Sequence, residues 1–326
     1  MKGAVIGLGA IGPIHINALI EKNVQIAALC DIDLKKCVQI KEKFSLDTNI
    51  YEDYLEMLDK EEIDVVHICT PHYLHAPMIC EALKRDINVL TEKPLAISLE
   101  QLDEIENAVK NSKAQLGVCF QNRFNSPTVY VREFLKGKEI VSAYCGFAWQ
   151  RDKSYYDSAE WRGTVAMEGG GVMINQAIHS LDLLILMCGM PTSVTAHTHN
   201  ISLKGVIEVE DTAIGVFNTK DNCVFSISAT NAVAYSFPFY YIFKTKDDVV
   251  TIADNHVIIN DEILTKSDKQ SMFGKDVWGS SHSKLIENYY KCIENGEKFE
   301  IDFYEGSKAI KALLAMYRSN GEKIDI

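Results

Sequence analysis

The sequence has a deficit of basic residues and no long apolar run. Lysine and arginine number 33 against 45 aspartates and glutamates, which gives a formal net charge of -12. A nucleic-acid surface needs clustered cations, so we expect no nucleic-acid partner. The longest strongly apolar stretch, residues 181–190, contains Asp182 and is too short to span a bilayer, so we expect no membrane partner.

Cysteine pairs of the Cys-x-x-Cys type are also absent from the sequence. The nine cysteines are scattered from Cys30 to Cys292, which in a chain of this length indicates buried thiols in a reducing compartment. Met1 and Lys2 lead directly into an apolar, strand-like segment, so we expect no signal peptide. A cytoplasmic location is the resulting expectation.

The first third of the chain alternates short apolar runs with helical patterns. At roughly 150 residues per domain, 326 residues suggest about two domains. Strands are predicted at 4–6, 25–30, 65–69, 88–90 and 115–120, and helices at 11–22, 34–44, 76–84 and 99–110. Ser98 is positioned to cap the last of these helices. The alternation predicts a doubly wound (Rossmann) parallel sheet over residues 1–120.

The pattern changes after residue 120. Helices are predicted at 128–136, 171–187, 283–294 and 304–317, and strands at 193–199, 212–217, 224–230, 239–244 and 249–252. Successive strands rich in β-branched and aromatic residues favour an antiparallel sheet. We therefore predict a C-terminal α/β domain over residues 121–326, with a large, mostly antiparallel open sheet.

A glycine motif, Gly7-x-Gly9-x-x-Gly12, follows the first predicted strand and opens the first helix. Gly7 would permit a tight turn, Gly9 the close approach of a pyrophosphate, and Gly12 the contact of helix with strand. Ala10 and Ile11 stand where a helix N-terminus presents free amides to phosphates. The motif predicts a dinucleotide site in residues 1–120, although a βα turn without a ligand remains the alternative reading.

Asp31 ends the second predicted strand, at the distance from the glycine motif expected of a carboxylate that binds the adenosine ribose. Asp31 and Asp33 would repel a 2′-phosphate, so NAD is favoured over NADP as the cofactor. Lys35 and Lys36 temper this preference.

Further segments complete a recognisable pattern. Thr70-Pro71 precedes His75, Glu92-Lys93-Pro94 follows the fourth strand, and a Glu-Gly-Gly-Gly run at 168–171 leads a helix that bears His179 and Asp182. Together these resemble the Gfo/Idh/MocA oxidoreductases, the relatives of glucose–fructose oxidoreductase and inositol dehydrogenase. The resemblance implies an open C-terminal sheet that mediates oligomerisation, so a homodimer or homotetramer is expected.

The resemblance also implies roles for individual residues. Thr70, Pro71, His75, Glu92 and Lys93 would contact the cofactor, and Lys93 would lie beside both the nicotinamide and the substrate hydroxyl. The Lys93–Pro94 peptide bond is expected to be cis, because only X–Pro bonds adopt this form at modest cost.

His179 would be the second member of an acidic-x-x-x-His pair on one helical face. The first position of that pair is Asn175, where the family pattern has Asp, and His72 stands where Asn is common. A carboxamide can orient a hydroxyl but cannot take its proton. We therefore expect His179 to act as the base, Lys93 to hold the substrate oxygen, and Asn175 to bind substrate. The alternatives are a solvated helix face around His179 and an exposed lysine before a turn proline.

Two further features concern the pocket and metals. Trp161 and Arg162 are predicted to bind substrate from a loop, with a hydrophobic plug and a surface ion pair as the alternative. The histidine pairs 72/75 and 197/199 lack a nearby cysteine or a clear carboxylate partner, so we expect no metal.

The sequence therefore predicts an oxidoreductase that transfers a hydride between NAD and a hydroxyl of a sugar, cyclitol or sugar acid. One alternative is a family member that retains its NAD while it cleaves a glycosidic bond or epimerises a sugar. Another is a catalytically silent NAD-binding regulator, against which the presence of both Lys93 and His179 argues.

Overall fold

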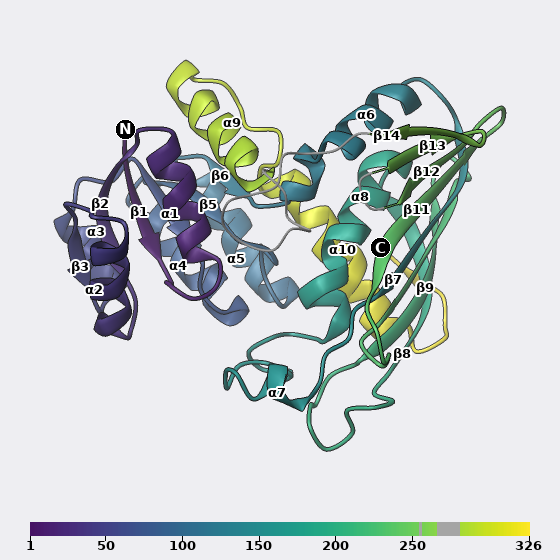
Figure 1. Cartoon of the computed structure of the whole chain (residues 1–326), viewed down its shortest axis with the longest axis horizontal. Coiled ribbons are helices and arrows are strands. Elements are labelled where there is room, and N and C mark those ends of the chain that lie inside the picture. Colours follow the sequence, from purple (N-terminus) through teal and green to yellow (C-terminus); the bar gives the residue numbers. More distant parts are fainter. Residues whose placement is uncertain (254–255, 266–280) are drawn as a thin grey trace. The chain divides into compact units, whose positions relative to one another are not determined.

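The computed structural model describes residues 1–253, 256–265 and 281–326 (Figure 1). The chain forms two compact units. Within the described residues, the first unit comprises Met1–Gln121 with residues 281–307, and the second comprises Asn122 onward through residue 265 with Lys308–Ile326. The domain predicted over residues 121–326 is interrupted in the structure. Residues 281–307 instead join the first unit, where helix α9 (Ser281–Asn295) packs against α1 (Gly12–Glu21).

The first unit is built on a six-stranded parallel sheet with the strand order β3-β2-β1-β4-β5-β6. This order confirms the predicted doubly wound fold, whose ligand crevice lies at the carboxyl ends of β1 and β4. The strands are β1 (Lys2–Ile6), β2 (Gln25–Cys30), β3 (Asn49–Tyr51), β4 (Val65–Ile68), β5 (Asn88–Thr91) and β6 (Leu116–Val118).

Helices connect these strands. They are α1, α2 (Leu34–Lys43), α3 (Tyr54–Lys60), α4 (His75–Leu83), α5 (Leu99–Lys110) and the later α9. The Ser98 side chain accepts a hydrogen bond from the Gln101 amide at 3.2 Å, which confirms the predicted cap of α5. The short elements β3 and α3 were not predicted, because three and seven residues give little periodicity to detect.

The second unit contains a nine-stranded sheet in the order β14-β13-β12-β11-β7-β10-β9-β8-β15. Neighbouring strands pair antiparallel except β7 with β10, so the predicted mostly antiparallel sheet is confirmed. The strands are β7 (Ile140–Ala148), β8 (Pro191–His199), β9 (Thr212–Thr219), β10 (Val224–Thr230), β11 (Phe237–Thr245), β12 (Val249–Ala253), β13 (His256–Ile259), β14 (Glu262–Thr265) and β15 (Ile324–Asp325).

Helices cover one face of this sheet. They are α6 (Ser126–Leu135), α8 (Ile178–Cys188) and the part of α10 (Phe303–Ser319) that lies in this unit, while the unit also contains the short helix α7 (Lys153–Tyr156). Helix α8 packs against β7 and β10. Along β9, inward residues are buried and outward ones exposed, yet the outward Ile214 and Val216 are apolar. The uncovered face of the sheet is therefore partly hydrophobic.

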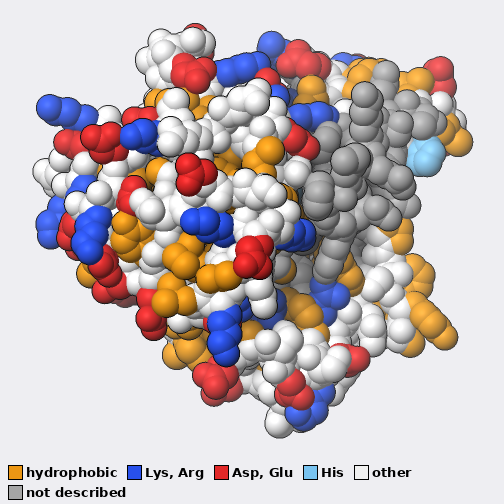
Figure 2. All heavy atoms as spheres, turned by 60° about the vertical axis from the view of Figure 1, so that its left-hand side comes forward, with side chains coloured by type: hydrophobic (Ala, Val, Ile, Leu, Met, Phe, Trp, Pro, Cys, Tyr) orange, Lys and Arg blue, Asp and Glu red, His pale blue; other side chains and the backbone are white. Residues whose placement is uncertain are grey.

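The surface of the first unit carries both signs of charge. On the described part of the face shown in Figure 2, acidic and basic side chains are interspersed over this unit. Among the described residues, no helix combines the length and the apolarity that crossing a membrane requires.

Candidate active site

The glycine loop of the first unit adopts the conformation that the motif predicts. Gly7 has φ +90°, and a Cβ there would lie 2.6 Å from the carbonyl oxygen of Cys69. A Cβ on Gly12 would collide with the Gly7 carbonyl, whereas a Cβ on Gly9 would meet no atom within 4 Å. The loop therefore packs tightly against β4 and α1, but it is open at Gly9, where a nucleotide would approach.

The N-terminus of α1 is available to an anion. Ile11 stands at the N-cap position, and no side chain caps this helix end. The free amides of the first turn, beside Ala10 and Ile11, then have the positive dipole end and the donors that a pyrophosphate needs. The residues present therefore fit the phosphates of a dinucleotide.

Asp31 lies directly after β2 and is fixed by the glycine loop. Its carboxylate accepts hydrogen bonds from the Leu8 amide at 2.8 Å and the Asp33 amide at 2.9 Å. The Lys36 ammonium lies 3.8 Å away. This position beside the glycine loop suits a carboxylate that binds ribose hydroxyls.

His75 joins two loops of the first unit. Its ring is 1% exposed, with Nδ1 2.7 Å from the Pro94 carbonyl and Nε2 2.9 Å from the Thr70 carbonyl. Burial lowers the pKa of His75. The ring thus holds the loop of Thr70 and Pro71 next to the segment of Lys93, whose bond to Pro94 is cis as predicted. Direct contact of His75 with a cofactor stays a prediction.

The Glu92 side chain points into the interior of the first unit. It is 6% exposed, its Oε1 lies 3.1 Å from His15 Nε2, and its Oε2 accepts the Lys93 amide at 3.3 Å. Burial alone would raise the pKa of Glu92, but the hydrogen bond to His15 and the nearby imidazole of His282 outweigh burial and hold that pKa well below its usual range. A cofactor contact of this carboxylate also stays a prediction.

In the second unit, Asn175 and His179 lie where a π-helical turn meets an α-helix. The turn spans Met173–Ala177 and α8 begins at Ile178, so the predicted helix over 171–187 is present but opens with a wider turn. The Glu210 carboxylate accepts the Gly171 and Met173 amides at 2.8 and 3.0 Å and fixes this entry. Such π turns are often found at functional sites.

A buried ion pair between Arg123 and Asp182 fixes the position of helix α8. Arg123 donates from Nε and Nη2 to the two carboxylate oxygens of Asp182, at 2.8 and 2.5 Å, and both side chains are almost fully buried. A bidentate pair of this kind fixes orientation as well as position. Asp182 was expected only as part of a motif, and no local spacing in the sequence points to Arg123.

A carboxyl group stands beside Asn175, although the sequence has no acid at that position. The Asn175 amide donates to Glu168, and so does the backbone amide of Gly163. Glu168 is 1% exposed, and burial raises its pKa to about 7 against the lowering effects of the Gly163 amide, Asn175 and Arg162. In the sequence Glu168 stands out only as part of the Glu-Gly-Gly-Gly run, so this contact was not predicted.

Tyr155 was also missed, and it links Asn175 to two arginines. Its hydroxyl donates to Asn175 Oδ1 at 3.4 Å and accepts from Arg162. The guanidinium carbons of Arg151 and Arg162 lie 4.5 and 4.4 Å from the Tyr155 ring centroid. Arg162 also lies 4.7 Å from the Trp161 ring centroid, so the structure brings Trp161, Arg162 and Asn175 into one cluster, as the substrate-binding prediction requires.

Both arginines keep a donor for a further partner. Among the described residues, the buried Nε atoms of Arg151 and Arg162 have no hydrogen-bond acceptor. Arg151 also lines a cavity of ≈ 520 Å³ together with Lys153, Ser202 and Asn231. Because an unsatisfied buried donor is costly, these two Nε atoms are suited to an acceptor oxygen from outside the described residues.

Comparison with known proteins agrees with both units. Residues 1–120 match the model of an oxidoreductase family with an NAD-binding Rossmann fold, and residues 137–250 match the GFO/IDH/MocA C-terminal domain. The chain belongs to the Gfo/Idh/MocA oxidoreductase family. Its first unit is accordingly an NAD-binding Rossmann domain.

Members of the Gfo/Idh/MocA family resemble the chain along its whole length. Myo-inositol 2-dehydrogenase of Thermotoga maritima is 23% identical over 331 residues, which cover 99% of this chain and 97% of that protein. The WlbA dehydrogenase of Chromobactrium violaceum, solved with NADH and UDP-GlcNAcA, is 27% identical with a TM-score of 0.86, over 100% of this chain and 96% of that one. Myo-inositol 2-dehydrogenase of Lactobacillus plantarum is 22% identical with a TM-score of 0.85, over 100% and 99%, and shows the shared fold.

Proposed function

We propose that this family member is an NAD-dependent dehydrogenase that oxidises a secondary hydroxyl of a sugar, cyclitol or sugar acid. The observation that carries the proposal is the cluster around Asn175, four residues before His179, in which a carboxyl group, a phenol and two guanidinium groups gather beside one π turn. Such a cluster suits a substrate with many hydroxyl oxygens.

Each residue has a distinct task in this proposal. Lys93 holds the substrate oxygen and stabilises the negative charge that develops on it. His179 accepts the hydroxyl proton, and Asn175 orients the substrate. Glu168 holds the Asn175 amide, so the Asn175 carbonyl oxygen is turned toward donors such as the Tyr155 hydroxyl. Bound NAD supplies the hydride acceptor.

The preference for NAD over NADP rests on Asp31. Its carboxylate is anchored by the Leu8 and Asp33 amides, so it cannot easily move aside for a 2′-phosphate. Lys36, 3.8 Å away, offsets only part of the repulsion because its side chain is about half exposed and screened by water.

The two arginines around Tyr155 favour a substrate that carries an anionic group. Guanidinium groups bind carboxylates and phosphates through paired N–H donors, and here the buried Nε donors of Arg151 and Arg162 are open among the described residues. Sugar acids and sugars with an anionic substituent are therefore favoured over neutral cyclitols.

The test is a substrate panel with two readouts. The purified protein is incubated with NAD and with matched neutral and acidic sugars, and both NADH absorbance and sugar products are measured. The proposal predicts NADH formation with an acidic sugar, and a much higher KM for that sugar in Arg162→Met. If only neutral polyols are oxidised, the preference for an anionic substrate is wrong, but the assignment as a dehydrogenase holds.

A second candidate is an enzyme that reduces and reoxidises the same bound NAD. A carboxyl group with a pKa of about 7 can release and regain a proton near neutrality, and Glu168 is such a group beside Asn175. This candidate predicts altered sugar product without net NADH, together with return of a deuterium label to the oxidised carbon from the reduced cofactor. Net NADH at the rate of substrate consumption would exclude it.

We also propose that the open face of the nine-stranded sheet forms the contact of a homodimer or homotetramer. Its outward residues Ile214, Val216, Val224 and Tyr240 are between 40% and 53% exposed, although they are apolar or aromatic. Such a patch is typical of a protein interface. Light scattering of the parent and of Ile214→Lys tests this, with a shift to monomer expected in the variant.

A further inference from the structure

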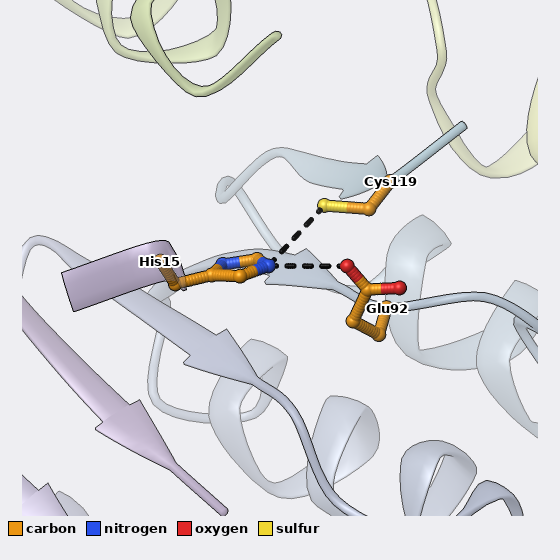
Figure 3. A group of neighbouring side chains, drawn as sticks. All are labelled: His15, Glu92 and Cys119. Atoms are coloured by element: carbon orange, nitrogen blue, oxygen red, sulfur yellow. Dashed lines mark hydrogen bonds and ion pairs between the residues drawn. The ribbon is translucent and has the colours of Figure 1, made fainter. Parts of the chain in front are cut away.

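Three metal-ligating atoms converge in the interior of the first unit, and a fourth lies beside one of them. They are His15 Nε2 from α1, Glu92 Oε1 directly after β5, Cys119 Sγ directly after β6, and His282 Nε2 from α9. Figure 3 shows the first three side chains directed toward one another. His15 Nε2 lies 3.1 Å from Glu92 Oε1 and 4.0 Å from Cys119 Sγ, and His282 Nε2 lies 3.7 Å from Glu92 Oε1.

The ligand atoms of His15, Glu92 and Cys119 all lie within 4.8 Å of one another and approach a tetrahedral shell, whereas His282 Nε2 is near Glu92 only and would have to move toward the ion to become the fourth ligand. Zinc binds histidine nitrogen and carboxylate oxygen at about 2.0–2.2 Å and thiolate sulfur at about 2.3 Å, so neighbouring ligand atoms lie roughly 3.3–3.8 Å apart. The three measured distances bracket that range. We propose that His15, Glu92, Cys119 and His282 form a structural zinc site.

The charge and burial of the cluster fit a divalent ion. One thiolate and one carboxylate balance the two positive charges of zinc, while both histidines bind as neutral imidazoles, so the bound site has no net charge. This matters because the four side chains are between 0% and 6% exposed, and an uncompensated charge there would be costly.

A second layer of hydrogen bonds holds the His15 ring. Its Nδ1 lies 2.8 Å from His67 Nδ1, and His67 Nε2 lies 2.9 Å from the Tyr290 hydroxyl. A histidine that binds metal through Nε2 donates from Nδ1 to such a partner, which fixes the ring. His67 then accepts at Nδ1 and donates from Nε2 to Tyr290. Without metal, His15 donates from Nε2 to Glu92. His67 then donates from Nδ1 to His15 Nδ1, and the Tyr290 hydroxyl donates to His67 Nε2.

The number of protein ligands indicates that the proposed zinc is structural, not catalytic. Four protein ligands leave no open position for substrate, which is typical of structural zinc. The ion joins α1, which begins at the glycine loop, to α9 and to the residue that precedes Lys93. It would thus hold the Lys93 segment and the nucleotide loop in one rigid body, whatever the substrate of the enzyme is.

Elemental analysis of the parent protein, produced without a histidine tag and dialysed into metal-free buffer, tests the proposal. We expect about one zinc per chain in the parent, and less than about a tenth of that in Cys119→Ser and His282→Ala. The matched control is Cys37→Ser, which alters another buried cysteine of the first unit and should keep its zinc. A metal-free parent, or equal zinc in parent and Cys119→Ser, overturns the site.

Two measurements on the parent alone decide the question if the variants do not fold. Replacing zinc by cobalt should produce a thiolate-to-cobalt absorption band and the visible bands of tetrahedral cobalt. In ¹⁵N-histidine spectra, His67 should carry its proton on Nε2 with metal and on Nδ1 after chelation. Cobalt that binds without the thiolate band is bound elsewhere, not at Cys119. That result, or a His67 tautomer that does not change on chelation, would show that the cluster is a hydrogen-bond network without metal.

Discussion

Replacing Glu168 by glutamine should change how the stability of the protein depends on pH. Burial raises the pKa of Glu168 from 4.5 to about 7. Between these values the folded protein keeps a proton that the unfolded chain releases, so the free energy of unfolding falls as the pH rises. A shift of about 2.5 pH units corresponds to roughly 3 kcal/mol, lost progressively up to about pH 7 and constant above it.

Glutamine cannot ionise, so the free energy of unfolding of the variant does not fall with pH through this group. Relative to the parent, Glu168→Gln should gain roughly 3 kcal/mol in unfolding free energy between about pH 4.5 and about pH 8. The altered hydrogen bonds to Gly163 and Asn175 add an offset that is the same at each pH. Only the change of the difference with pH therefore reports the titration of Glu168.

Urea unfolding followed by circular dichroism at several pH values measures this difference. Glu160→Gln is the matched control, since it makes the same chemical change on an exposed carboxyl of the same loop, and its curve should run parallel to that of the parent. A stability difference between Glu168→Gln and the parent that stays constant across the range would refute the reasoning. It would also remove Glu168 as a group that exchanges protons near neutrality.

Three further predictions concern the cofactor and the chemistry. Asp31→Ala should weaken NAD binding and remove the preference over NADP in calorimetric titrations, and NADP binding to the parent as tight as NAD binding would contradict the role of Asp31. Lys93→Met should lower turnover by roughly 10²-fold while the NAD affinity stays near that of the parent, and unchanged turnover would show that Lys93 does not hold the reacting oxygen. His179→Ala should abolish single-turnover NAD reduction at every pH, whereas Asn175→Ala should mainly raise KM; the reverse result would assign the proton to another group.

Local chemistry explains which parts of the fold could be predicted. The glycine loop, Asp31 after β2 and the Ser98 cap each depend on backbone geometry within a few residues, and the structure has all three. The aromatic segment at 236–241 contains Pro238, which is typical of an edge strand or a bulge. A register shift does occur between Phe237 and Tyr240, but β11 pairs on both sides, with β7 and β12. Sequence indicates an irregular strand but not its neighbours.

Strand β7 shows the limit of periodicity. It runs from Ile140 to Ala148 near the middle of the nine-stranded sheet, yet it was not predicted. Its small and polar residues, such as Ser142 and Gly146, weaken the strand signal. They are accommodated because Tyr240 of the neighbouring strand covers Gly146, a contact that exists only after the sheet has formed.

The sequence by itself determined the nucleotide-binding motif, the alternation that produces the parallel sheet, and the identity of Lys93, Asn175 and His179 as candidate site residues. Only the tertiary structure decided what surrounds them. The Arg123–Asp182 pair and the ligand atoms around Glu92 join segments distant in the chain, and Glu168 meets Asn175 seven residues away through the folding of the loop between them. The reason is physical: helix and turn patterns depend on neighbours within about four residues, whereas buried polar groups find partners through packing, which no local spacing encodes.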